Sequence, residues 1–472
     1  MAPALSFIPA INGLLRVEVR CRFQTHAARS GYQERDMITR IGVMVMVTSA
    51  LVAGASAETT STIPAPRAAV ESLPPAPPAP AYAPWNQFAN DLRDMWARMY
   101  ERVPERLRDD PQMRAEVSRL MLEAMLQQTV EALGQNGDHP AFMPHISFYM
   151  NVGQPNADTI YKRAIVTPGG TYRLRGRRGN LTIFKMGQMG LTPDQTGGGV
   201  RALSYGDFST LKVDAEGRFD VLLSPTRPAG YSGDWWKLEP DTRTLLLRQV
   251  SQDWSKEVDP AVSIERVDVP ARRPRATAQE IEARLRDIPR RAFFMAGFLV
   301  DHVEQMRREG YINKLRVLDV SNGGALVGQF YYEGAYELGE DEALIIEAKV
   351  PAHCGYSSMI LTNDIYETTN WFDNHSSLNG SQYHVDKDGV LRVVIANRDP
   401  GVANWLDTAG YRSGAVQGRW TDCDSQPVPT ARKVKLADLA RVLPADTPRV
   451  APAEREKIVR DRRAAVLQRP LW

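Results

Sequence analysis

Residues 171–184 read TYRLRGRRGNLTIF, and this stretch carries the pattern that decides the fold class. Tyr172 and Leu174 alternate with arginines, which is the period of two expected for a strand with one buried face. Gly179 and Asn180 are typical turn residues, and LTIF then continues as a second apolar run. The stretch therefore predicts an antiparallel hairpin.

The same strand pattern continues on both sides of this hairpin. An acidic turn that ends in Gly217 separates two further strand candidates, and another that ends in Gly389 does so later in the chain. The two groups of strands predict a first β unit over 137–275 and a second over 311–445. The predicted strands are 171–175, 181–184, 211–213, 218–223, 244–250, 262–267, 329–332, 344–350, 357–361, 383–385 and 391–396.

Sequence patterns typical of helices flank the two β units. Apolar residues recur at helical spacing from Trp85 to Met99, and Asp110, Pro111 and Gly134 punctuate a second helix. These two helices occupy 84–136.

Two more helical segments follow the first β unit. Thr277 and Glu280 form a capping-box pattern that opens a helical bridge over 276–310. We expect Pro289 to break this bridge into two helices and Gly310 to end it. A basic, amphipathic helix over 453–467 is predicted to close the chain, within a last segment of 446–472. The predicted fold is mainly β with helical additions (α+β): two antiparallel β-sandwich-like units joined by a helical bridge and preceded by an N-terminal helical pair.

An export signal is predicted over about 37–57. Arg40 precedes an apolar run over 41–53, which has the length of a signal-peptide core and is too short for a membrane span. Ala55-Ser56-Ala57 matches the small-x-small site of a signal peptidase, so the mature chain would begin near Glu58. We expect a periplasmic or secreted protein whose Ala/Pro-rich segment, 58–83, is an extended linker.

The segment 1–36, which completes an upstream region of 1–57, fits this signal poorly. It carries several arginines and few acidic residues, a composition that also suits an organellar transit peptide. The simpler interpretation is that Met37 is the working initiator.

Composition limits the possible partners. The chain of 472 residues is 43% hydrophobic, enough for two domains, and its 58 basic and 56 acidic residues give a net charge of +2. This balance predicts no nucleic-acid binding and no attraction to an anionic membrane. Cys354 and Cys423 follow the predicted cleavage site; in an oxidising compartment they either pair or remain two separate buried thiols.

The sequence lacks the strong cofactor and metal motifs. It contains no phosphate loop, no dinucleotide fingerprint, no Gly-x-Ser-x-Gly elbow, no His-Glu-x-x-His and no cysteine pairs at zinc spacing. Gly197-Gly198-Gly199 is interpreted as a flexible loop. We therefore predict no cofactor and no metal.

Two polar segments stand out as candidate sites, together with His375 and His384. Arginines that hold carboxylates next to tryptophan faces are suited to bind a ring or a sugar, but the same residues also suit an Arg–Asp clamp that ties a loop to a sheet. The candidate binding residues are Asn156, Asp158 and Tyr161 in the first segment, and Arg398, Asn404, Trp405, Arg419 and Trp420 in the second.

Within this set, specific roles follow from side-chain chemistry. Asp399 or Asp407 would act as acid or base, and His375 or His384 as a second proton carrier. Arg398 or Arg419 would stabilise an anion.

Both segments resemble an exported bacterial family that carries the domain of unknown function 1214, often found beside the related 1254 domain. The resemblance covers about 150–440 and implies a β-rich, sandwich-like fold with helical additions, but no established activity. In the first segment this chain has Asn-Ala-Asp in place of the family's Asn-Pro-Asp. The matching stretches are 156–161, 170–179, 238–244, 253–254, 264–266, 377–380, 398–401, 404–410 and 418–420.

These observations predict an exported periplasmic protein that binds or transforms a small, partly apolar or carbohydrate-like molecule without a nucleotide cofactor. An enzyme with these residues would be a hydrolase, lyase or isomerase. The alternative is a non-catalytic binding or scaffold protein of the cell envelope. We expect a small-molecule partner and no membrane span, and the oligomeric state is not predicted.

Overall fold

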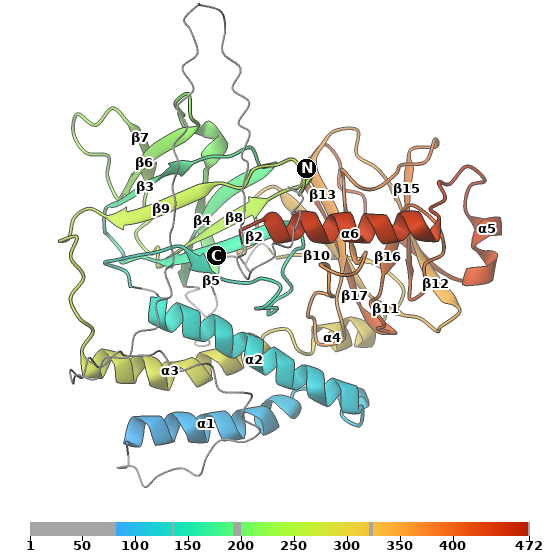
Figure 1. Ribbon diagram of the computed structural model, residues 1–472, viewed down its shortest axis with the longest axis horizontal. Helices are drawn as coiled ribbons and strands as arrows, with labels where there is room; N and C mark the ends of the chain where they lie inside the picture. Colours follow the sequence, from blue (N-terminus) through green and yellow to red (C-terminus); the bar gives the residue numbers. More distant parts are fainter. Residues whose placement is uncertain (1–81, 135, 192–199, 321–323, 471–472) are drawn as a thin grey trace, which may run out of the picture. The chain divides into compact units, whose positions relative to one another are not determined.

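Of the residues that the structure describes, 32% lie in strands or bridges and 26% in helices, which confirms the predicted fold class. The computed structural model describes residues 82–134, 136–191, 200–320 and 324–470 (Figure 1). The predicted signal peptide, the residues of the linker before Tyr82 and the loop with Gly197 lie outside these ranges.

The first sandwich contains two sheets that share one core. Alternate side chains of both sheets, among them Leu174, Met186, Val221 and Leu247, are fully buried between them. All pairings are antiparallel except that of β6 with β7. One sheet has the order β1 (Met143–Pro144), β2 (Thr159–Ile165), β8 (Thr244–Val250), β4 (Ile183–Leu191), β5 (Val200–Asp207); the other has the order β7 (Asp234–Lys237), β6 (Arg218–Ser224), β3 (Tyr172–Arg177), β9 (Ala261–Arg266).

The second sandwich repeats this plan with a different strand order. Its core includes Tyr332, Ile346, Val393 and Trp420, and the pairing of β15 with β16 is parallel. One sheet has the order β10 (Arg316–Leu318), β11 (Gln329–Glu337), β17 (Ser413–Cys423), β13 (Cys354–Leu361), β14 (Ser377–Asn379); the other has the order β16 (Trp405–Asp407), β15 (Val390–Ala396), β12 (Glu342–Lys349), β18 (Thr430–Lys435).

The hairpin predicted over 171–184 does not form. β3 pairs with β6 and β9, whereas β4 pairs with β5 and β8 in the opposite sheet. The turn at Gly179 thus leads the chain from one layer of the sandwich to the other. Both runs have a buried apolar face, and the shared core, not the turn, selects their partners.

Three helices pack together in one helical layer: α1 (Ala83–Tyr100), α2 (Pro111–Gly134) and α3 (Ala278–Gly297) (Figure 1). Their shared core contains Met99, Val117 and Ala292. The capping box of Thr277 and Glu280 is confirmed. The predicted break at Pro289 is wrong: α3 continues through this buried proline, and a separate helix, α4 (His302–Arg308), follows. The predicted helical bridge therefore packs against the N-terminal pair.

Other short helical turns are η1 (Glu105–Leu107), η2 (Phe208–Thr210), η4 (Leu436–Asp438) and α5 (Leu439–Val442).

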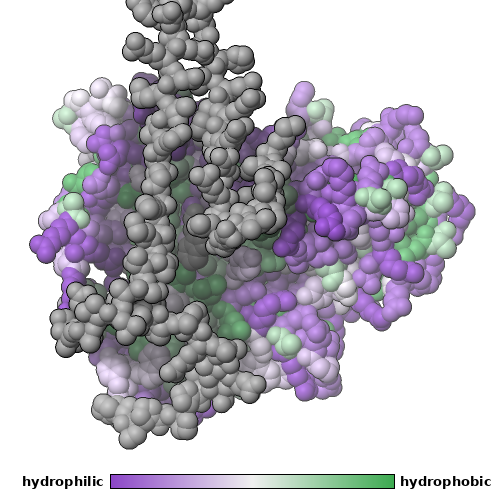
Figure 2. Space-filling view, in the orientation of Figure 1, coloured by the Kyte–Doolittle hydropathy of each residue, from purple (hydrophilic) through white to green (hydrophobic). Residues whose placement is uncertain are grey.

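The last helix, α6 (Pro452–Gln468), is held by arginines. Its buried residues are Arg455, Arg462 and Val466, so its inner face is basic and not the apolar stripe of an amphipathic helix. Where the described residues are visible around α6, hydrophilic residues predominate on the surface (Figure 2). Among the described residues, no helix is both long and apolar enough to cross a membrane.

The two sandwiches meet through their outer sheet faces. Ile183 and Val250 of the first sandwich form one hydrophobic cluster with Tyr356 of the second and with Leu326. The sheet with β8 and the sheet with β17 therefore face each other, and polar residues on these faces become buried.

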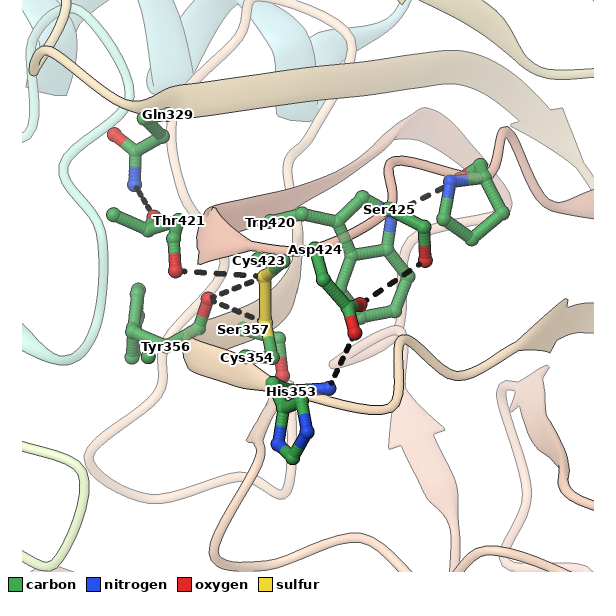
Figure 3. The surroundings of a disulfide bond; sticks show 12 residues. Gln329, His353, Cys354, Tyr356, Ser357, Trp420, Thr421, Cys423, Asp424 and Ser425 are labelled. Atoms are coloured by element: carbon green, nitrogen blue, oxygen red, sulfur yellow. Dashed lines mark hydrogen bonds between the residues drawn. A yellow bond between two sulfur atoms is a disulfide. The ribbon is translucent and has the colours of Figure 1, made fainter.

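Cys354 and Cys423 form a disulfide between β13 and β17 (Figure 3). The two residues are register partners in neighbouring antiparallel strands and are 69 residues apart in the chain. A disulfide is compatible with a secreted protein, because such bonds persist in oxidising compartments.

Two carboxyl groups, those of Glu123 and Glu367, lie where α2 meets the second sandwich. Glu123 accepts a hydrogen bond from the Asn151 amide (2.8 Å), and Arg119 pairs with Glu367 (2.6 Å). Burial and the nearby charge of Glu367 raise the pKa of Glu123 to about 7. This carboxyl group is therefore partly protonated near neutral pH.

We predict that removing the disulfide destabilises the protein. Closure of a loop between cysteines that are 69 positions apart in the sequence is worth about 4 kcal/mol in the chain-entropy model. Cys354→Ser/Cys423→Ser should unfold at a lower urea concentration than the wild type. Dithiothreitol should lower the wild-type midpoint and leave that of the double variant unchanged; an equal effect on both would contradict the prediction.

We predict that Glu123→Gln stabilises the protein at alkaline pH. Because the folded-state pKa is raised, the folded chain binds more protons than the unfolded chain between pH 4.5 and about 7, and wild-type stability falls as pH rises through this window. Above pH 7 the variant should gain about 1–3 kcal/mol, and near pH 4.5 almost nothing. Urea unfolding at both pH values measures this, with the exposed Glu101→Gln as the control. A gain that does not depend on pH would refute the titration of Glu123.

Candidate functional site

Asp158 is the buried centre of the contact between the sandwiches. It lies just before β2, and its side chain accepts hydrogen bonds from Trp254 Nε1 (2.9 Å), Asn379 Nδ2 (2.9 Å) and the Tyr356 hydroxyl (2.6 Å). Burial raises the pKa of Asp158, and hydrogen bonds from Tyr356 and Asn379 act against this shift. Because Tyr356 and Asn379 belong to the second sandwich, this carboxyl group joins the two units.

Asn156 belongs to the same network. Its amide donates to the Tyr356 hydroxyl (2.8 Å) and to Thr159 Oγ1 (3.0 Å), and its main-chain carbonyl accepts from the Thr159 amide. The first polar segment identified in the sequence is therefore a buried turn whose side chains bond across the interface.

Arg419 lies on the same interface, in the middle of β17. Side chains alternate along this strand, so Arg419 faces the first sandwich while Trp420 enters the core of the second. Arg419 is 4% exposed, and its guanidinium carbon lies 5.3 Å from the ring centre of Tyr331, its partner on β11. Nη2 donates to Gln417 Oε1 (2.7 Å), whereas Nε has no partner among the described residues.

A second arginine, Arg248 of the first sandwich, faces Arg419. Arg248 of β8 is the register partner of Tyr161 on β2, and both are partly buried. Nη2 of Arg248 donates to the Gly324 carbonyl (2.5 Å), and the Arg248 side chain also acts as a hydrogen-bond donor toward Tyr205, whereas its buried Nη1 makes no hydrogen bond of good geometry in the described chain. A Cβ atom at Gly187 would lie 3.5 Å from this Nη1, so the glycine leaves room beside it.

Tyr331 marks where these groups converge. Burial raises its pKa, and the positive charges of Arg419 and Arg248 act against this. Arg419 packs on its ring, and Arg248 projects from the facing sheet on the side away from the core residues Leu245 and Leu247. Tyr161 and Tyr205 influence the same hydroxyl. We name these five residues, Tyr161, Tyr205, Arg248, Tyr331 and Arg419, the Arg419 cluster.

A hollow of about 400 Å³ lies on the same edge of the interface. Lys185, which pairs with Arg248 in the β4–β8 register, lines it together with Asp207, Ser209 and Asp422. Space for a small molecule is thus present one strand away from Arg248.

A directed hydrogen-bond chain leads from Arg419 to a buried carboxylate. Gln417 accepts from Arg419 and donates to the Tyr366 hydroxyl (2.9 Å), which in turn donates to Glu333 Oε2 (3.2 Å). Tyr366 has a φ of 64°, which is costly for a bulky residue and frequent at functional sites.

Glu333 is kept ionised at the end of this chain. Arg316 (2.8 Å) and His302 Nε2 (2.9 Å) both contact its carboxylate. Burial acts to raise the pKa of Glu333, but His302 and Arg316 outweigh burial and lower it. The orientation of Gln417, and through it that of Arg419, is thereby fixed.

The residues predicted to be catalytic lie elsewhere. Asp399 pairs with Arg455 of α6 (3.0 Å), and Arg398 is exposed. Asp407 accepts from the Ala409 amide (2.8 Å), and burial, together with the charge of Asp399, raises its pKa. These contacts attach α6 to the second sandwich, and their role is structural.

Of the two histidine candidates, only His375 lies beside the arginines of α6. His375 is buried, and its Nδ1 donates to the Trp405 carbonyl (2.5 Å). Burial and the charges of Arg462 and Arg455 hold its pKa well below the usual range, so the ring is neutral. His384 is exposed, and Asn404 binds its main-chain amide and carbonyl.

The expectation that Trp405 and Trp420 form walls of one site is wrong. Trp420 is 1% exposed and lies in the core of the second sandwich, while Trp405 packs in a separate cluster beside α6. Adjacent strand residues point to opposite faces, so Arg419 and Trp420 cannot serve the same site. Of the predicted binding residues, the structure brings together Asn156, Asp158, Tyr161 and Arg419.

Sequence reasoning missed Tyr331, Arg248, Gln417, Tyr366 and Glu333. One signal was present: Arg248 is a single charge within the otherwise apolar strand Thr244–Val250. The described residues contain no group of three or more His, Cys, Asp or Glu side chains placed to hold a metal ion.

We predict that Tyr356→Phe destabilises the protein. Removal of the hydroxyl takes one buried hydrogen-bond partner from Asp158 and one from Asn156, which should cost about 1–3 kcal/mol. The matched control, Tyr149→Phe, alters an exposed tyrosine and should change stability by less than about 0.5 kcal/mol. Urea unfolding of both variants checks this; equal midpoints would show that the Asp158 network does not hold the sandwiches together.

Comparison with known proteins identifies similar folds without a function. No model of a protein family matches the chain, and no curated protein matches it. An uncharacterised protein from Burkholderia cenocepacia is 29% identical, with a TM-score of 0.69 over 75% of this chain and 98% of that chain. A protein from Vibrio parahaemolyticus is 9% identical, with a TM-score of 0.40 over 74% of this chain and all of that chain, and this similarity is too low to support an argument. The chain thus shares its fold with the Burkholderia protein.

Proposed function

We propose that the chain is an exported periplasmic protein that binds a small, partly apolar molecule at the Arg419 cluster without a nucleotide cofactor. The observation that carries the proposal is the convergence of Arg248 and Arg419, from two different sandwiches, with unpaired buried donors on both. Burying such groups without partners costs several kcal/mol, so a ligand that satisfies them gives a reason for their placement.

Tyrosines supply the apolar part of the cluster. Tyr161, Tyr205 and Tyr331 are partly buried, and their rings present flat faces with a polar end. A ring-bearing molecule suits these walls better than a sugar, because the tryptophans expected to stack on a sugar are inside hydrophobic cores.

Membership of the 1214-type exported family is part of the proposal. It is supported by the sequence stretches that resemble this family and by a fold of the kind that the resemblance implies. The Cys354–Cys423 disulfide is compatible with the export that the signal-like segment predicts.

A catalytic role is the second candidate, and the chain from Glu333 through Tyr366 to Gln417 favours it. Acid–base groups within reach of a bound molecule would fit hydrolase, lyase or isomerase chemistry. A non-catalytic envelope scaffold would need none of these buried polar groups.

We predict that Tyr331→Ala weakens small-molecule binding by about tenfold or more, since it removes the ring on which Arg419 lies. Saturation-transfer NMR with benzyl alcohol, phenol, benzoate and hexanoate would identify probes that bind the wild type. The exposed Tyr149→Ala variant should retain their binding. The proposal fails if no probe binds, or if Tyr331→Ala binds all of them as the wild type does.

A further inference from the structure

Of the four buried arginines of the described chain, Arg455 and Arg469 are paired with a carboxylate, and so is the partly buried Arg316. Arg469 forms a bidentate ion pair with Asp259 (2.8 and 3.0 Å). Arg455 pairs with Asp399 (3.0 Å), and Arg316 pairs with Glu333 (2.8 Å). This is the usual arrangement, because an unpaired guanidinium loses its hydration on burial.

Arg248 and Arg419 do not follow this pattern. Neither has a carboxylate within 4.0 Å among the described residues, and each has a buried nitrogen without a partner. Arg462 is also unpaired with a carboxylate and has two buried nitrogens without a partner in the described chain; it stacks on Trp254 (4.8 Å) and donates to Ser377 from α6. Arg248 and Arg419 differ from Arg462 because they project from the two sheet faces that meet between the sandwiches, where Arg419 packs on the ring of Tyr331 (5.3 Å).

The acidic groups near this pair are already engaged. Asp158 is held by Trp254, Asn379 and Tyr356. Glu333 is held by Arg316 and His302. Neither arginine therefore has a carboxylate of the described residues in direct contact, although, against the effect of burial, the charge of Asp158 acts on Arg419 and helps to raise its pKa.

Further donors and apolar groups complete the surroundings. The Tyr161 hydroxyl accepts from the Asn156 amide (3.4 Å), and its own proton has no acceptor among the described residues. Leu246 is on the Arg248 side of its sheet, two residues away, and Leu318 is the register partner of Tyr331. An anionic head with an apolar body would match this combination of donors and side chains.

We infer that the molecule bound at the Arg419 cluster is an organic carboxylate whose charged group is held by Arg248 and Arg419. This inference rests on the proposed binding function and specifies its ligand class. The planar guanidinium fork matches the two oxygens of a carboxylate, and a ring or short alkyl chain fits beside the tyrosines and leucines.

The test uses matched pairs of probes that differ in charge alone: benzoate with benzamide, and hexanoate with hexanamide. Calorimetric titration of the purified protein should give an affinity at least about tenfold higher for the carboxylate of each pair. Arg419→Met and Arg248→Met should each reduce the affinity for the carboxylate to that for the amide. Arg398→Met, an exposed control, and Arg462→Met, a buried control, should keep the difference.

The possible outcomes separate the inference from the proposed function. Equal affinity for carboxylate and amide, lost in Tyr331→Ala, would overturn the carboxylate and leave small-molecule binding intact. Tight binding of inorganic phosphate that exceeds that of benzoate and is lost in Arg419→Met would overturn the organic carboxylate in favour of a free oxyanion. Failure of all four probes to bind the wild type would reject both proposals.

Loss of the fold in a variant is controlled independently. Far-UV circular dichroism and the urea midpoint are measured for every variant. Arg419→Lys keeps the charge and removes the fork, so it should fold and bind benzoate with an affinity between those of wild type and Arg419→Met. Benzoate binding by Arg419→Lys that equals the wild type would show that the fork geometry is not used and would overturn a two-oxygen contact.

Discussion

The carboxyl group of Asp158 is the point on which the rest of the arrangement depends. It is 2% exposed, and a buried charge of this kind is tolerated only when donors surround it. Its donors come from Trp254 in the first unit and from Tyr356 and Asn379 in the second. A shift of one sandwich against the other would leave these groups unsatisfied, so the network selects one relative position.

Arginines of helix α6 also hold the two sandwiches in this relative position. Arg455 and Arg462 are seven residues apart, which brings them close to one side of the helix, and Arg469 directly follows the last helical residue. Arg455 binds Asp399 in the second sandwich, and Arg469 binds Asp259, the Gln249 carbonyl and the Asp158 carbonyl beside the first. The Arg419 cluster is consequently built on strands whose mutual distance is fixed from two sides, which is the kind of rigid support that a binding site needs.

Local sequence signals were reliable where local physics decides the structure. Period-two alternation predicted β structure around Tyr172 and Leu174, and the Thr277–Glu280 box predicted a helix start, because both depend on neighbours within a few residues. The hairpin over 171–184 failed because strand partners are chosen by the core that two sheets share. Pro289 failed as a helix break because packing of α3 against α1 and α2 offsets the cost of one proline.

The candidate site, like the fold, was predictable from the sequence only in part. By itself, the sequence determined that the chain is mainly β, that 156–161 and 398–420 are unusually polar, and that Arg419 and Asp158 deserve a test. Only the tertiary structure decided that Arg419 joins Asp158 and Tyr161, while Asp399, Trp405 and His375 join α6. The physical reason is that alternation along a strand states which residues share a face, whereas the identity of the opposing face depends on contacts between residues hundreds of positions apart.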